Sequence, residues 1–128
     1  MKFSPLRIFV VENHADSLHA LQYYLEQMGH AVIAATTMAE ALERLPGADC
    51  EVLISDIGLP DGSGWELLER ARLPRPIFAI AVSGYGMPED CERSVAAGFR
   101  AHLVKPTDPD ELDGLLEQAM AEKADARG

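Results

Sequence analysis

Cysteines and basic residues are scarce in this sequence, and it contains no long apolar run. Its two cysteines, Cys50 and Cys91, fit neither a metal-binding spacing nor a disulfide framework. Eleven Lys and Arg residues face 21 Asp and Glu residues, and the formal net charge of −10 disfavours binding to nucleic acid or to an anionic membrane. No apolar run approaches the ~20 residues of a membrane span, and Pro5 and Arg7 interrupt the position of a signal-peptide core. We therefore expect a cytoplasmic protein without direct contacts to nucleic acid or membrane.

The length predicts a single domain over residues 1–128, because one domain typically takes about 150 residues and neither a repeat nor a low-complexity linker divides this chain. Residues from about 122 to 128 are polar and small, so we expect this tail to fray.

Short apolar runs alternate with helical patterns five times along the chain. The apolar runs predict strands and the periodic segments predict helices, two of which begin with capping boxes, at Thr37–Glu40 and Ser63–Glu66. Strict alternation predicts an α/β fold with a doubly wound, five-stranded parallel sheet and helices on both faces. The expected strands cover residues 6–11, 30–36, 51–55, 77–82 and 101–104, and the expected helices cover 16–28, 37–47, 63–74, 88–97 and the segment from 109 onward.

Polar residues follow four of the five expected strands. Glu12 and Asn13 follow the first, Asp56 the third, Ser83 the fourth and Lys105 the fifth. In an open α/β sheet, ligands bind at the carboxyl ends of the strands, so these side chains are expected to converge at one edge.

The chemistry of this set is that of phosphoryl transfer. Two close carboxylates, Glu12 and Asp56, repel each other unless a cation or a proton lies between them, and hard oxygen ligands suit Mg²⁺. Lys105 adds a positive charge and Ser83 a hydroxyl that can contact phosphoryl oxygens. An aspartate is a competent nucleophile and would form an aspartyl phosphate.

These residues lie in four segments that together identify a family. The chain resembles the receiver domains of two-component response regulators over essentially its whole length. The resemblance implies a CheY-like, flavodoxin-like strand order of 2-1-3-4-5. The segments are Val10-Val11-Glu12-Asn13, Ser55-Asp56-Ile57-Gly58-Leu59-Pro60-Asp61-Gly62, Ala81-Val82-Ser83-Gly84 and Leu103-Val104-Lys105-Pro106.

The resemblance also implies a role for each residue. Asp56 is the expected phosphoacceptor, assisted by Lys105 and Ser83. The expected Mg²⁺ ligands are Glu12, Asn13, Asp56 and the backbone carbonyl of Gly58; Ser83 and His102 are the expected switch residues, and Pro106 is expected to follow a cis peptide bond. The domain would act as a regulatory phosphoacceptor rather than as an enzyme, apart from catalysing its own phosphorylation and dephosphorylation.

The implied partners are proteins. A histidine kinase or a phosphotransfer protein would donate the phosphoryl group. A downstream protein would bind the face formed by the fourth helix, the fifth strand and the fifth helix, and phosphorylation could favour a homodimer.

Two departures from the family pattern leave alternatives open. Asn13 replaces the usual aspartate and predicts weaker Mg²⁺ binding, and His102 replaces the usual aromatic switch residue. One alternative is a degenerate receiver that only binds proteins, and another is a receiver cut from a hybrid histidine kinase. A Mg²⁺-dependent phosphatase is disfavoured, because Gly58 stands where such an enzyme would need a second acid.

Overall fold

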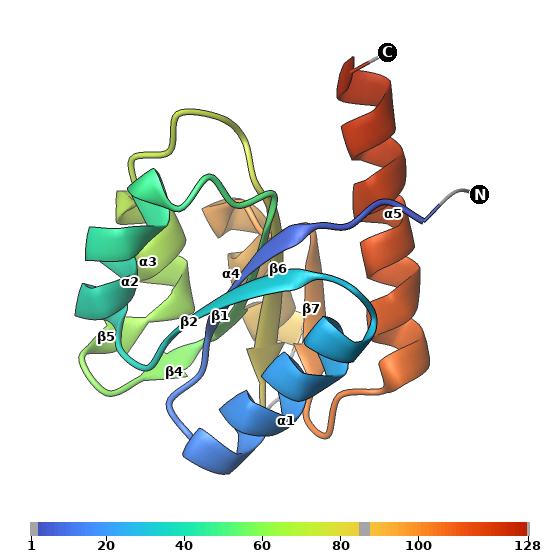
Figure 1. Ribbon diagram of the computed structural model, residues 1–128. Coiled ribbons are helices and arrows are strands. Elements are labelled where there is room, and N and C mark those ends of the chain that lie inside the picture. Colours follow the sequence, from blue (N-terminus) through green and yellow to red (C-terminus); the bar gives the residue numbers. More distant parts are fainter. Residues whose placement is uncertain (1–2, 85–87, 128) are drawn as a thin grey trace.

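A five-stranded parallel sheet with helices on both faces forms the body of the protein (Figure 1). The computed structural model describes residues 3–84 and 88–127. Its elements follow the predicted alternation of strands and helices. They are β1 (Arg7–Val11), α1 (Ala15–Gln27), β2 (Ala31–Ala35), α2 (Met38–Arg44), the 3₁₀ turn η1 (Leu45–Gly47), β3 (Val52–Asp56), β4 (Gly58–Leu59), β5 (Gly62–Ser63), α3 (Gly64–Arg70), β6 (Phe78–Ser83), α4 (Pro88–Ala97), β7 (Ala101–Val104) and α5 (Pro109–Arg127).

The strand order is β2-β1-β3-β6-β7, and all neighbouring strands of this sheet are parallel. Numbered by the five predicted strands, this is the order 2-1-3-4-5 that the family resemblance implied, so the fold prediction is confirmed. Asp56 pairs with Val82 of β6, and Ser83 pairs with Val104 of β7. The register therefore brings the carboxyl ends of β3, β6 and β7 to the same edge.

The core consists of two apolar layers, because successive residues of a strand point to opposite faces of the sheet. Ile8 and Val10 of β1 pack in the layer under α1 and α5, whereas Phe9 and Val11 pack in the layer under α2 and α3. Figure 1 shows α1 and α5 on one side of the sheet and α2 and α3 on the other. Burial on both faces explains why these strands are almost continuously apolar.

The predicted helix signals are present. The hydroxyls of Thr37 and Ser63 accept hydrogen bonds from the backbone N–H groups of Glu40 and Glu66 at 3.1 and 3.0 Å, so both residues are N-caps. Gly29 has a φ of +100°, a left-handed conformation that glycine adopts at little cost after a helix.

Two helix ends and one loop differ from the sequence prediction by more than one residue. Helix α2 ends at Arg44 and continues as the 3₁₀ turn η1, because Pro46 cannot donate the hydrogen bond that the next α-helical turn needs. Helix α3 ends at Arg70, before Pro74. Residues 58–63 form the short antiparallel hairpin β4–β5, where the sequence predicted only a turn.

The tail from residue 122 onward, for which the sequence predicts fraying, is helical as far as Arg127 in the described residues. Two contacts hold this end of α5 against the rest of the fold. Glu122 pairs with Arg100 through hydrogen bonds of 2.7 Å, and Lys123 pairs with Glu51 at 2.8 Å. Gly128 lies outside the described residues.

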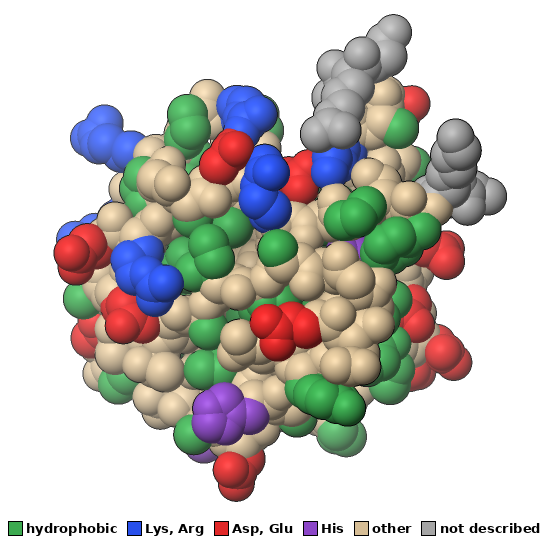
Figure 2. Space-filling view, in the orientation of Figure 1, with side chains coloured by type: hydrophobic (Ala, Val, Ile, Leu, Met, Phe, Trp, Pro, Cys, Tyr) green, Lys and Arg blue, Asp and Glu red, His purple; other side chains and the backbone are tan. Residues whose placement is uncertain are grey.

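Acidic residues outnumber basic residues by 21 to 11. Figure 2 shows basic side chains gathered over the upper and left parts of one face, with acidic side chains spread among them and along the right edge. Among the described residues, no helix combines the length and the apolar character needed to cross a lipid bilayer.

Candidate active site at the carboxyl edge of the sheet

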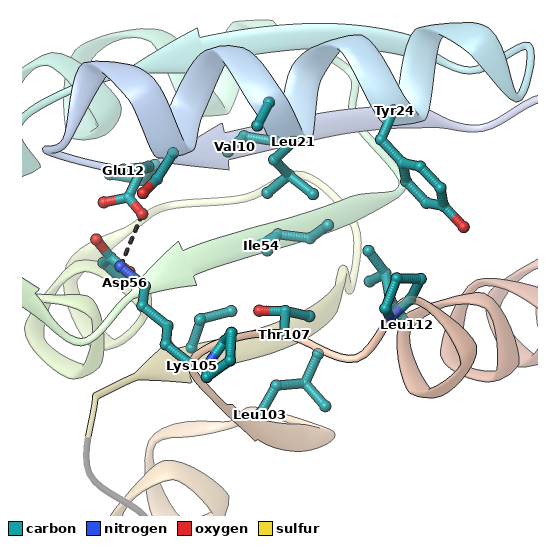
Figure 3. A pocket seen from close by; sticks show the side chains of 16 residues that line it. Val10, Glu12, Leu21, Tyr24, Ile54, Asp56, Leu103, Lys105, Thr107 and Leu112 are labelled. Carbon is teal, nitrogen blue, oxygen red and sulfur yellow. Dashed lines mark hydrogen bonds and ion pairs between the residues drawn. The ribbon is translucent and has the colours of Figure 1, made fainter.

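Three side chains from separate strand ends meet in one ion-pair cluster (Figure 3). The ammonium Nζ of Lys105 lies 2.9 Å from Oδ1 of Asp56 and 2.7 Å from Oε1 of Glu12. Glu12 and Asp56 are 5% and 6% exposed, whereas Lys105 is only partly buried. The convergence predicted from the sequence is therefore present for these three residues.

The backbone around Asp56 is fixed by its neighbours. The hydroxyl of Ser55 donates to the carbonyl oxygen of Asp56 at 2.9 Å, and the N–H of Ile57 donates to Val82 at 2.9 Å. Helix α3 begins directly against this strand end, since a Cβ on Gly64 would overlap the Asp56 carbonyl oxygen. A glycine is therefore needed where α3 approaches the candidate nucleophile.

The two carboxyl groups of the cluster have opposite pKa shifts. Burial, and then the neighbouring Glu12 carboxylate, raise the pKa of Asp56 to about 7, although Lys105 opposes this shift. Burial also disfavours the charged form of Glu12, but hydrogen bonds with Asp56, Lys105 and the backbone N–H of His14 lower its pKa to about 2. Two buried carboxyl groups beside one ammonium thus favour the binding of a proton or of a divalent cation.

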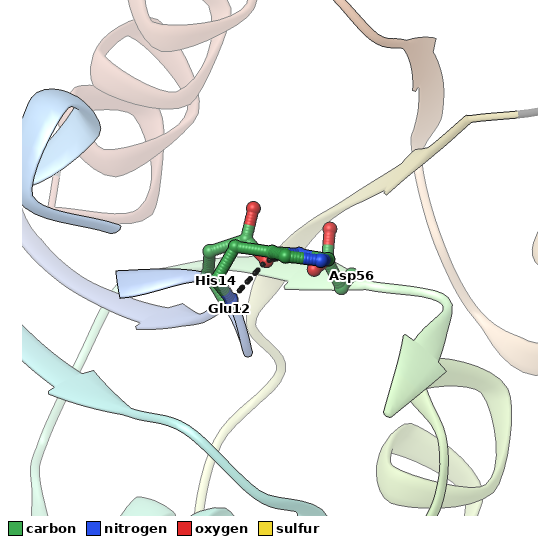
Figure 4. Close-up of side chains that lie close together, drawn as sticks. All are labelled: Glu12, His14 and Asp56. Atoms are coloured by element: carbon green, nitrogen blue, oxygen red, sulfur yellow. Dashed lines mark hydrogen bonds and ion pairs between the residues drawn. The ribbon is translucent and has the colours of Figure 1, made fainter. Parts of the chain in front are cut away.

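A group of possible metal-binding atoms lies at the same place (Figure 4). One atom each from Glu12, His14 and Asp56 lies within 4.8 Å of the others. The carboxylate oxygens of Glu12 and Asp56 fit a hard cation such as Mg²⁺, whereas His14 supplies a nitrogen, which Mg²⁺ rarely takes. The sequence analysis did not select His14, and its position two residues after Glu12 was the signal available.

The other predicted metal ligands flank this group. Asn13 is exposed on the loop between β1 and α1, next to Glu12. Gly58 begins β4, two residues beyond Asp56, and its backbone is exposed.

The predicted switch residues Ser83 and His102 contact each other. Ser83 Oγ lies 2.8 Å from Nε2 of His102, and the Ser83 carbonyl accepts a hydrogen bond from the N–H of Lys105 at 2.8 Å. Ser83 follows Val82, the residue paired with Asp56, so it occupies the next strand end along the edge. The Lys105–Pro106 peptide bond is cis, as the resemblance implied.

A groove of about 660 Å³ opens beside the ion-pair cluster, between α1 and the start of α5. Figure 3 shows Glu12, Asp56 and Lys105 at one end of the groove and Tyr24 at the other. Its floor is apolar and includes Val10 and Ile54. The cluster is therefore reachable from solvent, as attack on an external substrate requires.

Comparison with known proteins shows what class of domain this fold and this site define. Residues 8–117 match the response regulator receiver domain family. The chain belongs to this family, whose members are regulatory phosphoacceptor domains of two-component systems and interact with histidine kinases or phosphotransfer proteins.

Individual relatives agree with this assignment. The chain is 37% identical to an uncharacterized 14.6 kDa protein of Leptolyngbya boryana, with 90% of both chains covered. It is 32% identical to the two-component response regulator PhoP of Pseudomonas aeruginosa, over 87% of this chain and 50% of PhoP. It is 33% identical to the virulence sensor protein BvgS of Bordetella pertussis, over 93% of this chain but only 10% of BvgS.

Solved structures support the same fold. A CheY-like receiver domain of Methanospirillum hungatei is 33% identical and superposes with a TM-score of 0.85, covering 95% of this chain and 99% of that one. The chain thus matches one structure over nearly its full length, while it spans only part of the longer regulator PhoP and of BvgS.

Proposed function

We propose that Asp56 accepts a phosphoryl group from the phosphohistidine of a histidine kinase or a phosphotransfer protein. The observation that carries this proposal is the position of the Lys105 ammonium, within 2.9 Å of both the Asp56 and the Glu12 carboxylates at the edge of the sheet. It supports a nucleophile with a fixed positive charge beside it, which phosphoryl transfer needs.

In the proposed reaction, an Oδ atom of Asp56 attacks the phosphorus. A new O–P bond forms while the P–N bond to the donor imidazole breaks, and the bonding electron pair leaves with the imidazole nitrogen. Lys105 then stabilises charge on the phosphoryl oxygens, and the Ser83 hydroxyl donates a hydrogen bond to one of them. Hydrolysis of the acyl phosphate later returns Asp56 to its carboxylate form.

The reaction needs a divalent cation, and we propose that Glu12, Asp56 and the Gly58 carbonyl hold Mg²⁺, with the amide oxygen of Asn13 beside them. When bound, Mg²⁺ supplies positive charge to the phosphoryl oxygens. Asn13 contributes no charge of its own, so the pair Glu12–Asn13 holds the ion less strongly than two carboxylates would.

The output of the switch is proposed to be a change at the face formed by α4, β7 and α5. Two apolar side chains are exposed there, Val95 of α4 at 69% and Val104 of β7 at 44%. Such residues suit a downstream protein or a second phosphorylated copy of the domain. The free thiols Cys50 and Cys91 fit a reducing compartment such as the cytoplasm.

The decisive experiment is incubation with acetyl phosphate and Mg²⁺, followed by intact-mass analysis. We expect the mass of one phosphoryl group on the wild-type protein and none on Asp56→Asn, which keeps the size of the side chain. An Asp110→Asn variant makes the same change at an exposed aspartate of α5, serves as the matched control and should still be modified.

The result separates the proposal from a degenerate receiver. An unmodified wild-type protein that also fails to bind beryllofluoride would leave only a protein-binding role. Modification that persists in Asp56→Asn would move the phosphoacceptor to another residue.

A further inference from the structure

His14 brings an imidazole nitrogen to the carboxylates of the ion-pair cluster. Nδ1 of His14 lies 3.5 Å from Oε2 of Glu12, and the backbone N–H of His14 donates to the same oxygen at 3.1 Å. One possible ligand atom each from Glu12, His14 and Asp56 lies within 4.8 Å of the others (Figure 4). The structure therefore places two carboxylates and one nitrogen ligand around the same point.

Lys105 and His14 lie beside different oxygens of Glu12. The Lys105 ammonium is 2.7 Å from Oε1 of Glu12 and 2.9 Å from Oδ1 of Asp56. The ring of His14 lies beside Oε2 of Glu12 instead. An ion held between His14 and Oε2 therefore does not need the Glu12 oxygen that Lys105 contacts.

The spacing of these atoms suits a shared metal ion. Two tetrahedral ligands that each lie about 2.1 Å from a zinc ion are roughly 3.4 Å apart. The distance of 3.5 Å between Nδ1 of His14 and Oε2 of Glu12 is close to this value. The His14 side chain is 73% exposed, so it can rotate toward Asp56 without disturbing the core.

The donor set differs from one that is made of oxygen alone. Mg²⁺ prefers oxygen ligands, whereas Zn²⁺ and its neighbours Co²⁺ and Ni²⁺ bind imidazole readily. In this chain residue 13 is an uncharged asparagine and residue 14 is a histidine. Asn13 lowers the attraction for Mg²⁺, and His14 adds a ligand that suits a transition metal. Both residues thus shift the preference of the site in the same direction.

We propose that His14 is a metal ligand, and that with Glu12 and Asp56 it binds a divalent transition metal ion such as Zn²⁺ more tightly than Mg²⁺. This inference concerns the cation of the proposed function and rests on Glu12 and Asp56 binding an ion there. Three protein ligands leave further positions of the ion open, as in catalytic zinc sites. The two ions use the same carboxylates and therefore compete for the site.

The nitrogen chemical shifts of His14 test this ligation directly. Long-range ¹H–¹⁵N correlation spectra report both ring nitrogens of each histidine, and a His14→Phe variant assigns those of His14. We expect a ring nitrogen of His14 in the wild type to shift strongly when Zn²⁺ is added and to shift much less with Mg²⁺. Equal shifts with the two ions, or no shift at saturating Zn²⁺, overturn the inference.

Isothermal titration measures the contribution of His14 to the affinity. His14→Phe keeps a ring and removes both nitrogens. Loss of an outer partner of a metal ligand typically costs about 10-fold or more in affinity, so loss of the ligand itself should weaken Zn²⁺ binding at least about 10-fold. The affinity for Mg²⁺ should change by less than about two-fold, because Mg²⁺ takes oxygen ligands.

The matched control is His19→Phe, which makes the same change at another exposed histidine of α1 and should leave both affinities at the wild-type value. A smaller loss of Zn²⁺ affinity in His14→Phe, an equal loss for Zn²⁺ and Mg²⁺, or the same loss in His19→Phe overturns the role of His14. If His14→Phe does not fold, the wild-type spectra, assigned with His14→Gln, still decide the question.

Failure of this inference is distinct from failure of the proposed function. Phosphorylation of Asp56 in Mg²⁺, together with His14 nitrogens that do not respond to Zn²⁺, keeps the function and overturns the zinc site. A strong Zn²⁺-dependent shift of His14 in a protein that acetyl phosphate and Mg²⁺ never modify refutes the function and keeps the zinc site.

Discussion

The strands of the parallel sheet begin at one side, the amino edge, and end at the opposite side, the carboxyl edge. Charged residues have opposite roles at these two edges. At the amino edge, Arg7 and Arg75 both pair with Asp49, and Lys123 pairs with Glu51, so cations match or exceed anions. At the carboxyl edge, the single ammonium of Lys105 faces the buried carboxylates of Glu12 and Asp56.

The ion pairs at the amino edge contribute to stability, whereas the unmatched carboxylates at the carboxyl edge provide the chemistry. Matched ion pairs keep ordinary charge states and contribute modestly to folding. An excess of buried carboxylates costs free energy and favours the arrival of a proton or a cation. The carboxyl edge is therefore the part of the molecule that is ready to bind and react, and the amino edge holds the sheet and the end of α5 together.

The largest expected effect comes from Lys105→Met, which removes the ammonium and keeps most of the side-chain volume. Without it, charge on the phosphoryl oxygens is less well stabilised, so we expect phosphorylation of Asp56 by acetyl phosphate to slow on the order of 100-fold. Intact-mass time courses measure the rate. A reduction below about three-fold, with the fold retained by circular dichroism, would contradict the role of Lys105.

The second prediction concerns the free energy of unfolding in the absence of metal. The pKa of Asp56 is raised from 3.8 to about 7, so between these values the folded state holds more protons than the unfolded state. Stability must then fall as the pH rises through this range. Asp56→Asn removes the cost, and we expect it to be more stable than the wild type at pH 8 by on the order of 2 kcal/mol, with little difference at pH 4.

Urea unfolding in EDTA at both pH values measures this difference. The pH dependence that Glu12 contributes has the opposite sign. Because the pKa of Glu12 is lowered, this residue stabilises the fold above pH 4.5, its ordinary pKa, and the contribution is lost as the pH falls toward about 2. An Asp56→Asn variant that is equally stable or less stable than the wild type at pH 8 would show that the carboxyl groups at this edge are not strained.

The third prediction concerns a variant that increases the excess of negative charge at the carboxyl edge. Asn13→Asp adds a third carboxylate near Glu12 and Asp56, and we expect Mg²⁺ to bind about 10-fold more tightly, because the added charge attracts the ion. Isothermal titration with Mg²⁺ compares the two proteins, and Asn13→Ser is the neutral control. Equal affinities in wild type and Asn13→Asp would mean that residue 13 does not reach the ion.

The residues of the carboxyl edge were also the ones that could be predicted from the sequence alone. Asp56 and Lys105 were predictable because each directly follows a recognisable strand, and a parallel sheet brings strand ends to one edge. The strand order and the cis bond before Pro106 followed from the family resemblance. Helix ends were predicted less well, since α3 ends at Arg70 and not at Pro74.

Contacts between side chains of different helices and strands could not be predicted from the sequence. The bond between Trp65 and Ser94 joins residues 29 positions apart on two helices, and its existence depends on how α3 packs against α4. The helical end of α5 likewise depends on Lys123 reaching Glu51, across the fold from the tail. Such contacts are set by three-dimensional packing, for which the sequence gives no periodic signal.

The smallest expected effect is at the amino edge. Lys123→Met removes the partner of Glu51 and a hydrogen bond to the carbonyl of Pro5. Both side chains of the pair are mostly buried, at 15% and 19% exposure, so we expect a loss of about 1 kcal/mol in unfolding free energy. Phosphorylation should keep its wild-type rate, because this pair lies at the opposite edge from Asp56. A Lys123→Met protein that folds but reacts as slowly as Lys105→Met would show that the two edges are coupled. It would contradict the conclusion that the amino edge contributes only to stability.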